Sequence, residues 1–536
     1  MTTPARVAAA RSARGVRIAV VGGGISGLAA AHRLRTLLPD AAIVVLEQRD
    51  RLGGVLRTVD LAGMPFDVGA EAFLARRPEV PALLAELGLA GELVHPGVAE
   101  PTVRAGGVTV PLPGGTVLGV PTSGARLDRV LSPPGVAVAD AEPHRPLRWE
   151  PGGDVILGPL LRARFGDELA DRLVDPLLGG VYAGRVDALG LRATLPGLAA
   201  ALDAGAPSLT AAADRAPDRA TDPPRASRYD LTRESLRSDA RVDTNWPASR
   251  PDQARVSTVS TQPVSRSGTA SSVPTPAAAP VFGALRSGYT ALVDTLAAAS
   301  AADIRLSTTV RGLHRRPDGW RLVLGPTGQP EILDVDGVVL AVPAPAAARL
   351  LAETAPIAAR ALGEVELASS VVVALAYREA DGAPLPPTSG VLVAAGEPTS
   401  IKAATHSSRK WPHLARAADG LVRLRASLGR FGEAAMLQVD DAELLARVRA
   451  DLAVLGGISA APVAVHVQRW GGGLPQYAVG HLERVRAAED AVAGLSGLAV
   501  AGAALHGVGV PACIGTARAA AERVANDVTV RRAEAP

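Results

Sequence analysis

A glycine-rich turn between a short apolar strand and an alanine-rich helix constrains the fold of this chain most. Apolar residues follow a strand period over 17–21 and 42–46 and a helical period over 26–38, which predicts strand, helix, strand. This order forms a βαβ unit whose turn and helix N-terminus suit the pyrophosphate of a dinucleotide. A turn that binds no ligand is the alternative. The glycines with G-x-G-x-x-G spacing are Gly22, Gly24 and Gly27.

An acidic residue and a basic loop follow the turn. Glu47 ends the second predicted strand, where a carboxylate can accept hydrogen bonds from an unphosphorylated ribose. Residues 47–58 have the pattern E-x(3)-R-x-G-G-x(2)-R-T, in which Arg51 and Arg57 can engage phosphate and Gly53 and Gly54 allow close backbone approach. A solvated charged loop is the alternative for the arginines. The pattern resembles FAD-dependent amine oxidases, phytoene desaturases and protoporphyrinogen oxidases, which implies FAD rather than NAD.

Strand-like segments return late in the chain, near 304–310, 320–324, 335–342 and 498–501. This recurrence predicts an α/β fold: a Rossmann-like FAD-binding domain assembled from discontinuous segments, with an inserted α+β substrate domain. The predicted parts are a flexible tail over 1–15, the FAD-binding domain over 16–100, 281–345 and 490–530, the substrate domain over 101–203 and 346–489, and an insertion over 204–280.

Composition narrows the functional classes. Residues 204–280 are rich in Ser, Pro, Arg, Asp and Thr and predict a disordered insertion, with a regulatory or partner-binding role as the alternative. The 56 basic and 53 acidic residues nearly cancel, which argues against nucleic-acid binding. The single Cys513 excludes an internal disulfide and a multi-cysteine metal site, and fits a cytoplasmic location. The apolar stretch 18–31 is too short to span a bilayer, so we expect no integral membrane segment.

Later blocks resemble one family more specifically. Residues 66–77 (FDVGAEAFLARR) are similar to the F-D-x-G-P-E-S-F-L-x-R-K block of bacterial protoporphyrinogen oxidases, with Ala70 and Ala72 departing from Pro and Ser. The loss of that serine removes a hydroxyl contact. Arg76 and Arg77 match the basic position that faces substrate carboxylates, and a surface pair of arginines explains them equally well.

Four further segments carry the same resemblance. Residues 175–184 resemble the P-L-x-x-G-x-Y-A-G segment that shapes the substrate cavity, and 410–413 resemble K-W-P-x, with a tryptophan near the cofactor. Residues 474–481 match P-Q-Y-x-x-G-H, and 501–514 match the C-terminal G-V-G-x-P-x-C-I signature. Core packing is the competing interpretation for Trp411, Tyr477 and His481, and we favour it for His481 and for Cys513.

Together these blocks resemble the Gram-positive type of coproporphyrinogen III and protoporphyrinogen oxidases. The resemblance implies an FAD-dependent oxidase of heme biosynthesis that uses O2, converts coproporphyrinogen III to coproporphyrin III by six-electron oxidation, and releases H2O2. It names no catalytic acid or base and no metal, and it leaves room for loose membrane association and for contact with the next heme-pathway enzyme. The implied substrate-binding residues are Arg76, Arg77 and Tyr182, and the implied cofactor-binding residues are Gly22, Gly23, Gly24, Ile25, Ser26, Gly27, Glu47, Gln48, Arg51, Gly53, Gly54, Arg57, Gly69, Ala70, Glu71, Ala72, Val310, Trp411, Gly502, Val508, Gly509 and Val510.

Three alternatives stay open. The first is oxidation of protoporphyrinogen IX to protoporphyrin IX. The second is another flavin oxidase, acting on amines or carotenoid precursors, although the chain has only five Phe, five Tyr and five Trp for the aromatic cage of an amine oxidase. The third is a flavin-binding scaffold without activity.

Overall fold

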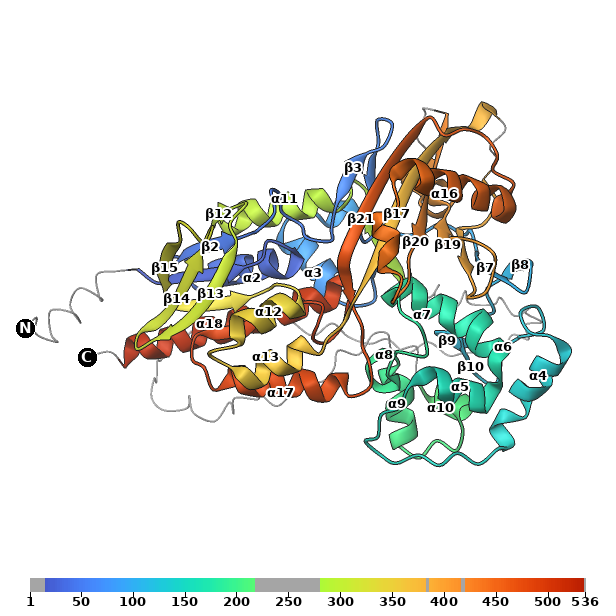
Figure 1. Ribbon diagram of the computed structural model, residues 1–536, viewed down its shortest axis with the longest axis horizontal. Coiled ribbons are helices and arrows are strands. Elements are labelled where there is room, and N and C mark those ends of the chain that lie inside the picture. The colour runs from blue at the N-terminus through green and yellow to red at the C-terminus, as the bar shows by residue number, and fades with distance from the viewer. Residues whose placement is uncertain (1–14, 217–279, 382–384, 416–419, 535–536) are drawn as a thin grey trace, which may run out of the picture. The chain divides into compact units, whose positions relative to one another are not determined.

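The computed structural model describes residues 15–216, 280–381, 385–415 and 420–534. A five-stranded, all-parallel sheet forms the first part of the fold (Figure 1). The predicted strand, helix and strand of the βαβ unit are present as β1, α2 and β2. The strands, in spatial order, are β12 (Asp303–Arg305), β2 (Ala42–Leu46), β1 (Arg17–Val21), β16 (Gly337–Leu340) and β22 (Leu498–Val500).

Alternate residues of each strand point to opposite faces of this sheet, so each face has its own apolar core. Helices cover the first face. Ile18 and Val20 of β1 pack into one core cluster with the helices, whereas Ala19 and Val21 pack into a second cluster on the opposite face. The helices of the first face are α2 (Ile25–Leu37), α3 (Glu79–Glu86), α11 (Tyr289–Ser300) and α18 (Val510–Ala533).

A small antiparallel sheet and three helices cover the opposite face. The predicted boundary of the FAD-binding domain at 345 falls inside this layer, because α12, α13 and α17 pack on the parallel sheet. The layers that pack on the parallel sheet therefore continue beyond residue 345. The elements are β13 (Val310–Arg316), β14 (Gly319–Leu324), β15 (Glu331–Val335), α12 (Ala344–Leu351), α13 (Pro356–Gly363) and α17 (His481–Ala493).

A seven-stranded sheet forms the second part of the fold. One of its faces packs on α16 (Asp441–Gly456), and the other packs on Leu61, Phe66 and Trp411. Strands β18 and β7 pair in parallel, while the remaining pairs are antiparallel. In spatial order the strands are β21 (Ala464–Pro475), β17 (Leu367–Arg378), β20 (Leu421–Leu428), β19 (Ile401–Thr405), β18 (Gly390–Val393), β7 (Pro101–Ala105) and β8 (Val108–Pro111).

A cluster of short helices with its own apolar core lies below this sheet in Figure 1. Its last helix lies within the predicted insertion, so disorder from residue 204 is wrong for this stretch. Ser208 caps the helix, and Leu209, Ala212 and Ala213 are buried. Residues 217–279 lie outside the described residues. The helices are α4 (Pro133–Asp140), α5 (Leu157–Phe165), α6 (Asp167–Leu169), α7 (Asp175–Tyr182), α8 (Leu191–Thr194), α9 (Pro196–Asp203) and α10 (Leu209–Arg215).

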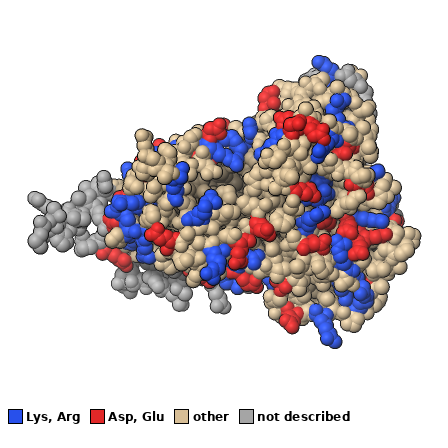
Figure 2. All heavy atoms as spheres, in the orientation of Figure 1, with Lys and Arg blue, Asp and Glu red and all other residues tan. Residues whose placement is uncertain are grey.

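Short ribbons and turns connect these layers. Acidic and basic side chains are interspersed over the face shown in Figure 2. Within the described ranges, we find no helix that combines the length and the apolarity needed to cross a membrane. The remaining elements are β3 (Thr58–Asp60), β4 (Pro65–Asp67), β5 (Phe73–Leu74), β6 (Leu93–Val94), β9 (Thr116–Val117), β10 (Val120–Pro121), β11 (Phe282–Leu285), α14 (Ser407–Lys410), α15 (Pro412–Ala415), the π-helix Ala170–Val174, and the 3-10 helices Ala90–Glu92, Glu142–His144, Glu379–Asp381 and Ala434–Gln438.

Candidate functional site

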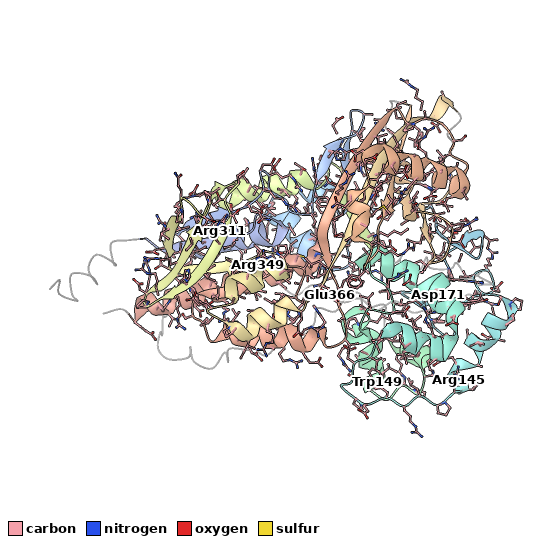
Figure 3. The ribbon with its side chains drawn as sticks, in the orientation of Figure 1. Arg145, Trp149, Asp171, Arg311, Arg349 and Glu366 are labelled. Carbon is pink, nitrogen blue, oxygen red and sulfur yellow. The ribbon has the colours of Figure 1, made fainter. Side chains whose placement is uncertain are left out.

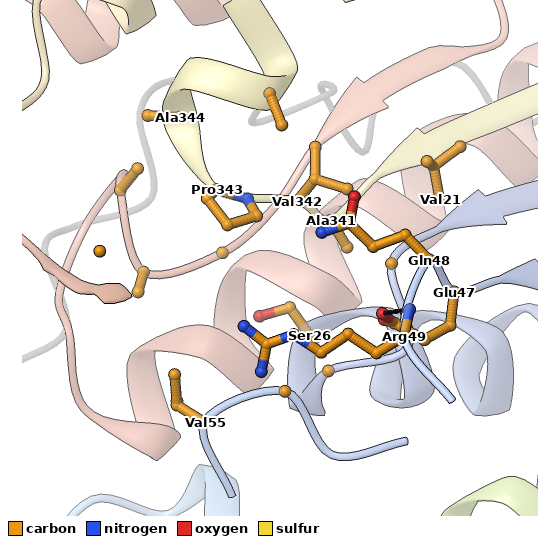
Figure 4. A pocket seen from close by; sticks show the side chains of 18 of the residues that line it. Val21, Ser26, Glu47, Gln48, Arg49, Val55, Ala341, Val342, Pro343 and Ala344 are labelled. Atoms are coloured by element: carbon orange, nitrogen blue, oxygen red, sulfur yellow. Dashed lines mark hydrogen bonds between the residues drawn. The ribbon is translucent and has the colours of Figure 1, made fainter. Parts of the chain in front are cut away.

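A cavity of about 480 Å³ opens at the carboxyl ends of β1 and β2 (Figure 4). This edge of an open parallel sheet is where such folds bind ligands, and the volume is in the range of small-molecule sites. The walls come from distant stretches of the chain. They include the turn before α2, the loop after β2, the loop before α12, the end of β21 and the loop before α18.

The glycine turn packs too closely against neighbouring backbone for side chains at two of its positions. A Cβ on Gly22, where φ is +108°, would lie 2.4 Å from the Ala341 carbonyl oxygen. A Cβ on Gly27 would lie 1.8 Å from the Gly22 oxygen, so α2 packs this closely only with glycine. Gly24 precedes α2 and provides no side-chain cap, so the first-turn N–H groups are available to an anion. This cradle fits a dinucleotide pyrophosphate.

Glu47 lies at the cavity with both carboxylate oxygens already positioned. Its Oε2 accepts from the Gly23 N–H at 2.7 Å, and its Oε1 accepts from the Arg49 N–H at 2.8 Å. Each oxygen has a second lone pair, so the side chain can still accept from a ribose hydroxyl. Gln48 also lines the cavity beside it.

Arg51 and Arg57 of the basic loop bind protein groups. Arg51 donates to the carbonyls of Leu52 at 3.0 Å and Gly54 at 2.8 Å, and its guanidinium lies 5.7 Å from the centre of the Trp470 ring. Arg57 donates to Gln468 at 2.6 Å. Neither arginine lines the cavity, whereas Gly53 and Gly54 do, and these glycines pass close to Gly24. The observed role of Arg51 is to hold this loop.

The block 67–72 is fixed through its carbonyl groups. Arg425 donates to the Asp67 oxygen at 3.0 Å and to the Gly69 oxygen at 2.9 Å, and the Trp470 indole donates to the Val68 oxygen at 2.9 Å. A Cβ on Gly69 would lie 1.9 Å from the Val55 oxygen. Since Val55 lines the cavity, this block supports the cavity wall from behind.

Glu71 forms an ion pair outside the lining of the large cavity. It accepts from Lys410 at 2.8 Å and from Ser407 at 3.2 Å. Burial alone would raise the pKa of Glu71, but the nearby cations Lys410 and Arg425 lower it to about 2. Trp411 is only 1% exposed and packs in the core, and neither it nor Ala70 and Ala72 lines the large cavity.

The residues predicted to bind substrate contact different parts of the protein. Arg77 pairs with Glu79, and Arg76 has partners within the protein. Tyr182 ends α7, packs against Tyr477 with ring centres 5.4 Å apart, and has its pKa raised to about 12 by burial. The substrate roles of these residues stay predictions.

The C-terminal block reaches the cavity through its first residues. Gly502 lines the cavity, whereas Val508, Gly509 and Val510 continue to the start of α18 and do not line it. Cys513 is buried at the cavity edge, and burial raises the pKa of its thiol to about 11. A protonated, buried thiol agrees with a packing role.

Several lining residues were not predicted from the sequence. Arg311 on β13 and Arg349 on α12 come from elements that pack on the same face of the parallel sheet (Figure 3). Nothing local in the sequence distinguishes them, because only the fold brings them to Glu47. Others of this kind are Arg49, Thr308, Thr309, Val342, Pro343, Leu367, Trp470, Gly471, Gly472, Gly473 and Pro475, while Val310, predicted by resemblance, does line the cavity.

Comparison with known proteins identifies the group to which this fold and cavity belong. The family model described as flavin containing amine oxidoreductase matches residues 25–525. The chain belongs to the flavin containing amine oxidoreductase family. The glycine turn, Glu47 and the cavity at the sheet edge are therefore parts of a flavin-dependent oxidoreductase.

Relatives within the flavin containing amine oxidoreductase family match almost the full chain. The chain is 42% identical to a coproporphyrinogen III oxidase of Mycobacterium leprae, over 95% of this chain and 98% of that protein. It is 27% identical to a coproporphyrinogen III oxidase of Bacillus subtilis, over 94% and 96%. The fold also matches a crystal structure of a candidate protoporphyrinogen oxidase from Exiguobacterium sp. 255-15, with a TM-score of 0.74, 28% identity, and coverage of 96% and 99%.

Proposed function

We propose that this chain oxidises coproporphyrinogen III to coproporphyrin III with FAD as cofactor and O2 as electron acceptor. The main observation in support is the 42% identity over 98% of a protein with that name. A bound flavin would supply the redox chemistry, as a hydride acceptor for the substrate and an electron donor to O2, so the six-electron oxidation would consume three O2 and release three H2O2.

The residues of the chain supply position and electrostatics. The first-turn N–H groups of α2 would hold the pyrophosphate, Glu47 would accept from the ribose, and Gly53 and Gly54 would let the loop pass beside the cofactor. Val55, Leu367 and Trp470 would cover the apolar part of the cavity. We also propose a cytoplasmic site of action, which cell fractionation tests.

Anaerobic mixing with coproporphyrinogen III tests the activity. We expect the oxidised flavin band to bleach within the mixing experiment and to return when air is admitted, with coproporphyrin fluorescence appearing. Protoporphyrinogen IX in place of coproporphyrinogen III gives the ratio of kcat/KM for the two substrates. A larger kcat/KM for protoporphyrinogen IX would reassign the substrate, and bleaching by neither would overturn the proposal.

A further inference from the structure

The segment Pro475–His481 touches the loop before α18 at two points. The Tyr477 hydroxyl donates to the Ala503 carbonyl oxygen at 2.6 Å, and His481 Nε2 lies 3.0 Å from the Leu505 carbonyl oxygen. Gly502 and Ala503 line the large cavity. Two side chains therefore fix the carbonyl groups of a loop that would contact the flavin.

The chemistry of His481 determines the direction of its hydrogen bond. The ring is fully buried, and burial lowers the pKa of His481 to about 4, so it is neutral near pH 7. A carbonyl oxygen only accepts, and the proton of the neutral ring therefore lies on Nε2. The Tyr477 ring stacks on His481 with centres 3.9 Å apart and an angle of 18° between planes. Each ring thus restrains the other.

Tyr477 also contacts Tyr182, the last residue of α7. The two tyrosine rings are 5.4 Å apart, and the Gln476 amide donates to the Tyr182 carbonyl oxygen at 2.8 Å. The Gln476 N–H donates to the carbonyl oxygen of Glu366, a residue labelled in Figure 3. The residue before β17 and the last residue of α7 thus hold this segment, while the Tyr477 hydroxyl and the His481 ring bond to the cavity loop.

We propose that Tyr477 and His481 are positioning residues that fix the loop 502–505 against the flavin. This inference rests on the proposed flavin-dependent function and deepens it. Loss of the Tyr477 hydroxyl would leave the Ala503 carbonyl without its buried donor, and the loop could then shift by relaxing toward other partners. Such a shift would change the contacts of the flavin, because the loop forms part of its cavity.

The Tyr477→Phe variant removes only the hydroxyl and keeps both ring contacts. We expect the Kd for FAD to rise about five- to tenfold, the flavin midpoint potential to shift, and kcat to fall while the KM for coproporphyrinogen III stays near the parent value. Tyr377→Phe is the matched control, since the buried Tyr377 hydroxyl has no partner among the described residues and lies in the core beside α16. We expect it to retain the parent Kd and potential.

His481 provides a second, independent pair of variants. His481→Gln keeps an N–H donor for the Leu505 carbonyl and is expected to retain most FAD affinity, whereas His481→Leu removes the donor and is expected to behave as Tyr477→Phe does. A parent-like FAD Kd and potential in Tyr477→Phe would overturn the inference. Equal weakening by Tyr377→Phe would also overturn it. FAD titration needs no porphyrinogen, so failure of the proposed substrate would remain a separate result.

Discussion

The Asp67 carboxyl lies at the N-terminus of α11 and beside a small second cavity. Its Oδ1 accepts from the Thr58 hydroxyl at 2.6 Å and from the Tyr289 N–H at 3.1 Å. Burial nevertheless raises the pKa of Asp67 to about 7, because the low dielectric opposes the charged form more than these donors stabilise it. The folded chain therefore holds a proton that the unfolded chain releases near pH 4.

The Asp67→Asn variant tests how this raised pKa affects the pH dependence of stability. Because the folded pKa is raised, the folded state of the parent loses stability as pH rises from about 4 to 7, and the full loss is present above pH 7. We expect Asp67→Asn to exceed the parent in Tm at pH 8 by an amount on the order of 2–5 °C, and the difference to shrink at pH 5. Thermal unfolding at both pH values measures it. The exposed Asp140 supplies the control Asp140→Asn, and a pH-independent difference for Asp67→Asn would contradict the prediction.

Glu142 is a second buried carboxyl, and its hydrogen-bond and ion-pair partners keep it charged. It is fully buried and binds Arg164 at 2.7 Å, the backbone N–H groups of Leu209 and Thr210, and the Thr210 hydroxyl. Burial raises the pKa of Glu142, but these donors outweigh it and lower the pKa below its ordinary value. One carboxylate thus joins α5 to α10.

Glu142→Ala would leave the Arg164 guanidinium buried without its anion. We expect the free energy of unfolding to fall by about 3–5 kcal/mol, measured by denaturant titration. Glu331→Ala breaks the exposed pair with Arg305 and should cost about 0–1 kcal/mol. Similar losses in both variants would show that burial of the pair is not decisive.

At the scale of elements, the contact between α2 and β1 depends on one missing side chain. Gly27→Ala would place a Cβ 1.8 Å from the Gly22 oxygen, so α2 must move away from the turn. We expect FAD affinity to fall about 10- to 100-fold, measured by fluorescence titration. Gly328→Ala places its Cβ in open space and should leave the affinity unchanged. Parent affinity in Gly27→Ala would remove the packing argument.

The elements that sequence predicted well are those specified locally. Gly22, Gly24 and Glu47 have their positions set by one βαβ unit, and the structure brings all three to the cavity. Helix α10 was missed because composition averaged over 204–280 concealed seven residues with a Ser208 cap. Arg311 and Arg349 were missed because their position depends on how separate elements pack, which no local spacing encodes.

At the scale of the whole molecule, the large cavity joins stretches that are far apart in the chain, from Val21 to Cys513. A ligand that touches all of them binds the folded state and not the unfolded one. We expect the apoprotein to be less stable than the FAD-loaded protein, by about 2.7 kcal/mol when free FAD is 100 times its Kd. Thermal unfolding over a series of FAD concentrations measures this, and a Tm that ignores FAD would contradict it.

Strand β22 and helix α18 complete the cavity late in synthesis, because they are the last elements of the chain. A ribosome synthesises a chain from its N-terminus, so the glycine turn is made early, whereas Leu498–Val500, the loop at Gly502 and α18 are made at the end. A nascent chain can present Gly22–Gly27 long before the wall that should enclose the flavin exists. We therefore expect stable flavin binding only in chains that include this loop. Chains that end before Leu498 should be purified without the yellow colour of bound flavin.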